Sequence, residues 1–164
     1  MIEKTFPLVE KLIVDALTNA GQLLEQLNQE ADALKTIQQT ESIDRIAANK
    51  KLLVSKLEQF NVDLGRILAS ENLPGNQQGI DEYFIRAAAA NLCTEPSASH
   101  WQSIRTLCAA SKVLNEQNGA SIDLLNRHTK RSLQILKGKP QHTSTYGPDG
   151  ITQSDSYART LVMA

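Results

Sequence analysis

Apolar residues recur every three or four positions over the first forty residues of the chain. Two positions of a seven-residue repeat are filled by Val9, Ala16 and Leu23 and by Ile13, Ala20, Leu27 and Leu34. Side chains at this spacing share one face of a helix and pack in the seam of a bundle or coiled coil. The pattern predicts a helix from Pro7 to about Thr40, with Pro7 in its first turn and Thr5 or Phe6 at its cap.

A second apolar stripe begins in a new phase after the polar stretch from Gln38 to Ser42. Its members are Ile43, Ile46, Leu53, Leu57, Phe60, Leu64 and Ile67. The change of phase favours a tight reversal and an antiparallel hairpin over one continuous rod. The sequence Leu73-Pro74-Gly75-Asn76 is expected to end this second helix.

Two further helices are predicted downstream. The first runs from about Gly79 to Cys93, with Asp81 and Glu82 in its first turn. Its apolar face consists of Ile80, Tyr83, Phe84, Ala87 and Ala88. For the last helix, the capping-box pair Ser99 and Gln102 predicts the start, and Lys137 followed by Gly138 predicts the end. We therefore predict an all-α fold, an elongated antiparallel hairpin or bundle of three to four helices in one domain, residues 1–137.

The last helix is uneven along its length. A regular stripe fills its first half, with Trp101, Ile104, Leu107, Cys108 and Leu114. In the second half Asn118, Gly119 and other polar residues interrupt the stripe, so this half should be marginal unless something covers it. Residues 138–164 are rich in Lys, Pro, Gln, Ser, Thr and Gly, which predicts a flexible C-terminal tail with one turn at residues 146–150.

Composition narrows the setting in which the protein works. No apolar run approaches the roughly 20 residues that a membrane span requires, and the N-terminus has no signal-peptide pattern, so we expect a cytoplasmic protein. The net charge is −1, which gives no general attraction to nucleic acid. Cys93 and Cys108 lack metal-site spacing and are expected to stay free thiols.

No arrangement of reactive residues indicates catalysis. The histidines, His100, His128 and His142, are far apart and have no carboxylate or cysteine at ligand spacing. Four carboxylates that we considered for acid–base chemistry are expected on solvent faces: Glu30, Asp32, Asp81 and Glu82. We therefore predict no enzyme activity, no cofactor, no metal and no small-molecule substrate.

The end of the last helix is basic, with Arg127, Lys130, Arg131, Lys137 and Lys139. This cluster is either a solvated face near the negative end of the helix dipole or a contact for an acidic partner surface. Aromatic residues do not alternate with these cations, which weighs against nucleic acid.

Four stretches in the C-terminal part of the chain carry a resemblance to a known family. They are residues 100–104 (HWQSI), 114–119 (LNEQNG), 133–137 (LQILK) and 145–150 (TYGPDG). In this order and spacing they resemble the FlgN family of flagellar export chaperones. Before Trp101 the resemblance is limited to the shared pattern of a long helical hairpin.

The resemblance implies specific partners. Such chaperones bind the disordered C-terminal segments of hook–filament junction (hook-associated) proteins, prevent premature assembly and deliver these clients to the cytoplasmic domain of the type III export gate. The family's gate-contacting tyrosine would be Tyr146, next to Gly147. The matching client-binding positions on the last helix are Leu114, Asn118, Ile122, Leu125, Leu133 and Leu136.

Two alternatives stay open on the sequence alone. The leucines of the last helix could close this protein's own bundle or a homodimer instead of binding a client. The chain could also be a structural coiled-coil adaptor that acts through homo-oligomerisation.

Overall fold

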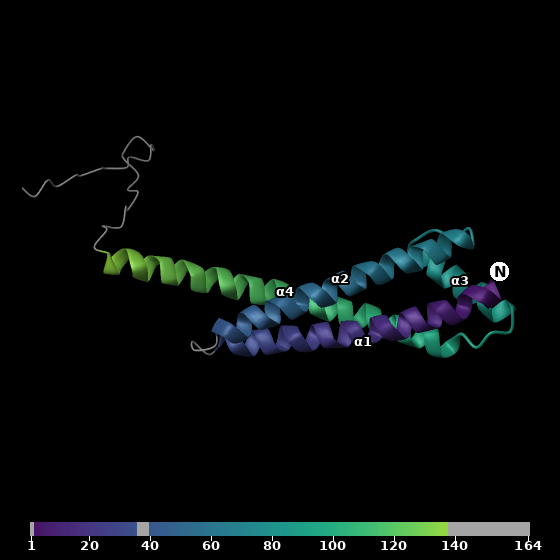
Figure 1. Ribbon diagram of the computed structural model, residues 1–164, viewed down its shortest axis with the longest axis horizontal. Helices are drawn as coiled ribbons and strands as arrows, with labels where there is room; N and C mark the ends of the chain where they lie inside the picture. Colours follow the sequence, from purple (N-terminus) through teal and green to yellow (C-terminus); the bar gives the residue numbers. More distant parts are fainter. Residues whose placement is uncertain (1, 36–39, 138–164) are drawn as a thin grey trace, which may run out of the picture. The chain divides into compact units, whose positions relative to one another are not determined.

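The computed structural model describes residues 2–35 and 40–137. These residues form four α-helices and contain no strand, which confirms the predicted all-α fold (Figure 1). The helices are α1 (Ile2–Leu34), α2 (Thr40–Ser70), α3 (Gln77–Ala89) and α4 (Glu95–Leu136). The chain divides into two compact units, Met1–Ile122 and Asp123–Ala164. The predicted tail, residues 138–164, lies outside the described residues, and the domain boundary at residue 137 stays a prediction.

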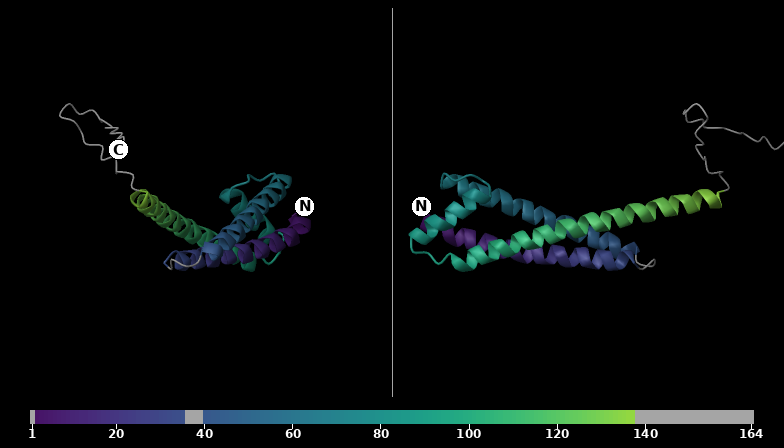
Figure 2. Two further views of the ribbon diagram at one scale, coloured as in Figure 1. Left: turned by 60° about the vertical axis from the view of Figure 1, so that its left-hand side comes forward. Right: turned by 180° about the vertical axis from the view of Figure 1, so that it is seen from behind.

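Helices α1 and α2 form the predicted antiparallel hairpin. The ribbon views show them side by side, with α3 near the start of α1 (Figures 1 and 2). At one end the Thr5 hydroxyl lies 2.9 Å from Glu71 Oε1, just after α2. At the other end Lys50, early in α2, contacts Glu30, late in α1. These two pairs fix opposite chain directions, although the reversal itself, residues 36–39, lies outside the described residues.

The predicted seams form the core of the first unit. Five of the seven α1 seam residues are buried, Val9, Ile13, Ala16, Ala20 and Leu27, and the other two, Leu23 and Leu34, are half-buried. Ile46, Leu53, Phe60 and Leu64 of α2 are buried too. From α3 and α4 the core receives Ile80, Tyr83, Phe84, Ala87 and Ile104. Burying one large aliphatic side chain contributes about 1.5–3 kcal/mol, so this seam is the main source of stability. Ala88, predicted on the apolar face of α3, is exposed.

Helix α1 begins at Ile2 rather than near Pro7, so the predicted cap at Thr5 or Phe6 is wrong. Pro7 is the sixth helical residue and gives up only the hydrogen bond that its missing N–H would make to Glu3. Buried Phe6 and core-packed Ile2 hold this first turn in place. Tertiary packing here outweighs the local signal of the proline.

The starts of the last two helices also differ from the predictions. Asn76 caps α3, and its side-chain oxygen accepts the Gly79 N–H at 3.0 Å, so Asp81 and Glu82 fall in the second turn rather than the first. At Gly79 an added Cβ would collide with the carbonyl oxygen of the preceding loop. Helix α4 begins at Glu95, because a proline at the next position suits a first turn that needs no N–H donor there. The predicted Ser99–Gln102 capping box is therefore wrong: both residues lie inside α4.

Two asparagines, rather than the Pro-Gly pair, end α2 and α3. Asn72 has a φ of 58° and Asn91 a φ of 59°, the left-handed conformation that closes a Schellman motif. After α2, the N–H of Leu73 donates to the Leu68 carbonyl at 2.8 Å. After α3, the N–H of Leu92 donates to Ala87 at 3.1 Å. Consequently α2 ends at Ser70, before Pro74, and α3 ends at Ala89 rather than at Cys93.

Candidate functional site

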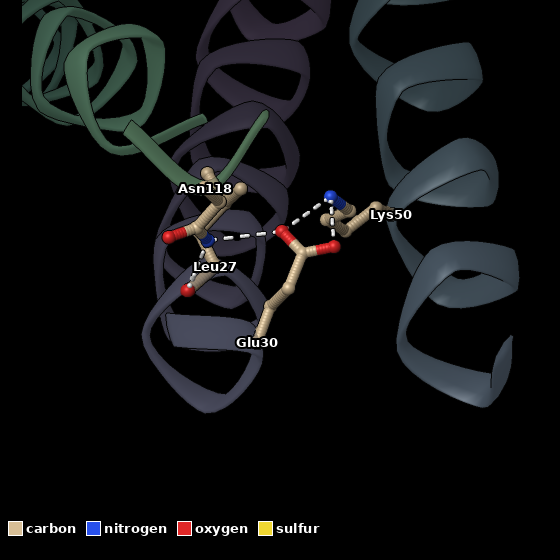
Figure 3. Close-up of polar contacts among 4 residues, drawn as sticks. All are labelled: Leu27, Glu30, Lys50 and Asn118. Carbon is tan, nitrogen blue, oxygen red and sulfur yellow. Dashed lines mark hydrogen bonds and ion pairs between the residues drawn. The ribbon is translucent and has the colours of Figure 1, made fainter. Parts of the chain in front are cut away.

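A buried polar layer joins three helices of the first unit (Figure 3). Lys50 Nζ lies 2.6 Å from Glu30 Oε2 and 2.7 Å from Oε1, so α2 is tied to α1. Asn118 Nδ2 donates to Glu30 Oε2 and to the Leu27 carbonyl oxygen, both at 2.9 Å, so α4 is tied to α1. Glu30 is 2 % exposed and Asn118 is 4 % exposed. The prediction that Glu30 lies on a solvent face is therefore wrong.

All three residues of this polar layer occupy seam positions. Glu30 follows Leu23 by seven residues, and Lys50 lies midway between Ile43 and Leu57 at the same spacing. In α4 the buried residues are Ser97, Ile104, Ser111 and Asn118, each seven residues after the one before. The repeat was therefore the signal that could have identified Glu30 and Lys50 from the sequence. A paired polar layer among apolar layers favours one register of the helices over the alternatives.

The second unit presents a different surface. Every residue from Asp123 to Lys137 is exposed. Three of the predicted client-binding residues are here: Leu125 is 45 % exposed, Leu133 47 % and Leu136 82 %. At about 100° per residue they fall within an arc of roughly 80° on α4. We name these three residues the leucine face.

Two more apolar side chains in this unit, Leu124 and Ile135, are exposed on a separate arc about 120° from the centre of the leucine face. The sequence pattern did not single them out. The exposed cations Arg127, Lys130 and Arg131 lie on an arc centred about 150° from the centre of the leucine face. This part of α4 is therefore amphipathic, and all of its large apolar side chains are exposed.

The remaining predicted site residues do not join the leucine face as one exposed surface. Leu114 and Ile122 are half-buried in the first unit, and Asn118 is buried with its side-chain amide already hydrogen-bonded. Tyr146 and Gly147, predicted to contact the export gate, lie outside the described residues. The predicted set thus separates into three exposed leucines, three residues packed in the first unit, and two that the structure does not describe.

The described residues offer little reactive chemistry. In residues 2–35 and 40–137 no group of three His, Cys, Asp or Glu side chains is placed to hold a metal ion. Both cysteines are free thiols, as predicted. No described helix has an apolar stretch long enough to cross a membrane.

Comparison with known proteins agrees with this description. The family model described as FlgN protein matches residues 5–154, nearly the whole chain. Neither the curated proteins nor the solved structures contain a match. The match includes most of the hairpin, all of α4 and residues 146 and 147. The chain therefore belongs to the FlgN family, which indicates a general role as a flagellar export chaperone.

Proposed function

We propose that this protein is a cytoplasmic chaperone that binds the C-terminal helical segments of hook–filament junction proteins. In this role it prevents their premature assembly and delivers them to the cytoplasmic domain of the type III export gate. The observation that carries the proposal is the leucine face, three leucines that lie on one side of α4 and are all exposed. The protein needs no cofactor and performs no catalysis in this role.

A helical client segment suits the leucine face physically. An amphipathic helix binds by laying its apolar side chains against a complementary apolar face at helical spacing. Burying one leucine side chain of either partner contributes about 1.5–3 kcal/mol to the free energy of binding. The entropy lost when a disordered client segment becomes ordered offsets about 2–5 kcal/mol of the sum. Three leucines therefore support binding that is specific yet weak enough to release the client for export.

Cations on the remaining side of this part of α4 add a charge preference. Arg127, Lys130 and Arg131 are exposed, and no described residue forms an ion pair with them. Lys130 is the nearest of the three to the leucine face, about 60° around the helix from Leu133, so a carboxylate at the edge of a client's apolar face would gain a favourable contact there. Because an exposed pair contributes only about 0–1 kcal/mol, we assign the affinity to the leucines and the orientation of the client to Lys130.

Two double variants test the leucine face. Leu133→Gln with Leu136→Gln should weaken binding to a purified junction protein by about 100-fold, because two buried contacts of about 1.5 kcal/mol each are lost. The matched control is Leu124→Gln with Ile135→Gln, which removes two exposed apolar side chains from the other arc of the same helix. The control should change the affinity by less than about threefold. Equal losses in both variants would contradict the proposal.

The proposed gate contact is tested separately. Tyr146→Ala should leave the affinity for the junction protein unchanged and weaken binding to the cytoplasmic domain of the export gate. The proposal for Tyr146 rests on the family resemblance of residues 145–150. Loss of both interactions in this variant would refute two separate contact sites.

The alternative function, an adaptor that self-associates, uses the same exposed leucines. A second copy of the chain could cover the leucine face as a helix pair. Sedimentation distinguishes the two functions. The chaperone should form a complex with one client and lose any homodimer on client binding, whereas an adaptor should remain a stable oligomer with or without client.

A further inference from the structure

A second uncovered surface lies entirely in the first unit. It is a groove of about 650 Å³ between α1, α2 and α4. Leu23 and Leu27 of α1 contribute apolar side chains to it, Val54 lines it from α2, and Cys108 and Ser111 line it from α4. The lining is mostly apolar, and Val54 is among the exposed large hydrophobic residues. We name this surface the three-helix groove.

The dimensions of the three-helix groove match a helix. Its lining residues on α2 extend from Ala47 to Glu58, three turns of helix or about 16 Å. They are spaced three and four residues apart, the spacing of side chains on a helix face that packs against another helix. On the α4 side, the buried hydroxyl of Ser111 has no hydrogen-bond partner among the described residues. The groove therefore has the length and periodicity of a vacant helix position.

Charges on the groove walls indicate what kind of helix fits. Lys51 of α2 and Lys112 of α4 both line the groove, are exposed, and have no ion-pair partner in the described part of the chain. Lys50 also lines it, but Glu30 already neutralises that ammonium group. Glu58 adds a carboxylate two turns along α2 from Lys51. The two unpaired cations exceed this single carboxylate, so an acidic edge on the occupant is favoured.

We propose that the three-helix groove binds an amphipathic helix of a partner protein whose apolar face is flanked by carboxylates. The occupant would form a fourth helix against α1, α2 and α4. A second copy of this chain fits less well through its own amphipathic stretch, because residues 123–137 carry four cations and a single carboxylate, Asp123, whereas the unpaired Lys51 and Lys112 favour carboxylates. The groove shares no residue with the leucine face, so this proposal can be tested independently of the proposed function.

The native cysteines permit a site-specific test. In the full chain with Cys93→Ser, Cys108 is the single thiol and lines the groove. Leu133→Gln and Leu136→Gln are added so that binding at the leucine face does not contribute. The probe is a synthetic helical peptide of about 15 residues with leucines on one face and glutamates on its flanks. The rate of Cys108 alkylation is measured as this peptide is added.

We expect saturable protection of Cys108 by about tenfold at saturating acidic peptide. A peptide with lysine in place of each glutamate should bind at least about tenfold more weakly. The double variant Lys51→Glu with Lys112→Glu should lower the affinity for the acidic peptide by about tenfold, because two attractive contacts become repulsive. The matched control, Lys4→Glu with Lys11→Glu, makes the same charge change at exposed lysines outside the groove and should leave the affinity unchanged.

Three results would overturn the inference. One is equal binding of the acidic and basic peptides. Another is equal weakening by the Lys51/Lys112 and Lys4/Lys11 charge reversals. The third is equal protection of Cys93 in a chain that carries Cys108→Ser, since Cys93 does not line the groove. None of these results depends on whether a junction protein binds the leucine face.

Discussion

Glu30 and Lys50 form a buried ion pair in a seam that is otherwise apolar. Their side chains are 3 % and 18 % exposed, and Lys50 Nζ lies 2.6 Å from the Glu30 carboxylate. Both residues stand where the seven-residue repeat of their helices would place an apolar side chain. The pair therefore fixes how α1 and α2 align, while Asn118 extends the same contact to α4.

Removing one member of this pair should destabilise the fold. Lys50→Met leaves the Glu30 carboxylate buried with only Asn118 as side-chain partner, at a cost of about 3 kcal/mol. The double variant Glu30→Leu with Lys50→Met should recover most of that loss, because apolar side chains replace the whole pair. Urea unfolding followed by circular dichroism measures both values. A single variant as stable as the unmodified chain would show that the pair does not hold the seam.

Asn118 should hold the end of the first-unit part of α4 on the hairpin. Asn118→Ala removes two hydrogen bonds, one of them to a carboxylate, and should raise the amide exchange rate of residues 112–122 by about tenfold. The control is Ser111→Ala, one repeat earlier, whose hydroxyl has no partner among the described residues and whose loss should have little effect. If both variants exchange alike, the amide of Asn118 has no special role.

The seams of the hairpin could be predicted from the sequence because apolar burial dominates there. Val9, Ile13 and Leu27 followed the repeat and are buried. Glu30 was missed because a carboxylate in a helix is usually solvated, and only its place in the repeat indicated otherwise. Its partner Lys50 is twenty residues away on another helix, so the pair could not be identified without knowing how the helices align.

Helix boundaries were the least predictable feature of the fold. Pro7 and the Ser99–Gln102 pattern are genuine local signals for a helix start. Packing of Ile2 nevertheless moves the start of α1 toward the N-terminus, and Pro96 in the first turn places the start of α4 at Glu95. The stops at Asn72 and Asn91 depend on a left-handed residue that asparagine, unlike most residues, adopts readily. These ends were decided by backbone geometry that an apolar pattern does not report.

Gly119 should weaken α4 just before the leucine face. It is helical and exposed, and an added Cβ would meet no atom within 4 Å, so Gly119→Ala is sterically free. The substitution should stabilise the helix by about 0.4–1 kcal/mol and slow amide exchange nearby about two- to fivefold. Ala120→Gly is the matched opposite change and should speed exchange by a similar factor. Faster exchange in Gly119→Ala would contradict this assignment.

Alkylation of Cys108 should have an unusual pH dependence. Although the residue is exposed, partial burial of its thiol in the three-helix groove raises its pKa above the ordinary value. Only the thiolate reacts, so in the Cys93→Ser chain the alkylation rate should reach half its maximum at a higher pH than in the same chain unfolded in urea. The raised pKa also means that this thiol's contribution to stability is complete below the unfolded pKa and is lost as the pH rises through the folded one. A folded midpoint at or below the unfolded midpoint would contradict the burial.

The exposed leucines of α4 were only partly predictable. The family resemblance selected Leu125, Leu133 and Leu136 as candidate client contacts, and the structure leaves all three exposed. Asn118 belongs to the same stripe but is used within the first unit. Sequence spacing places residues on one face of a helix, but it does not say which of them pack in the core of the first unit.

The proposed function requires that the leucine face be uncovered in the free protein and covered by a client helix in the complex. Amide hydrogen exchange over residues 123–136 tests it most directly, in the free protein and with a purified hook–filament junction protein. We predict rapid exchange in the free protein and slowing by about tenfold or more in the complex, with α1 unchanged. Strong protection of residues 123–136 in the free protein that the junction protein does not alter would contradict the account.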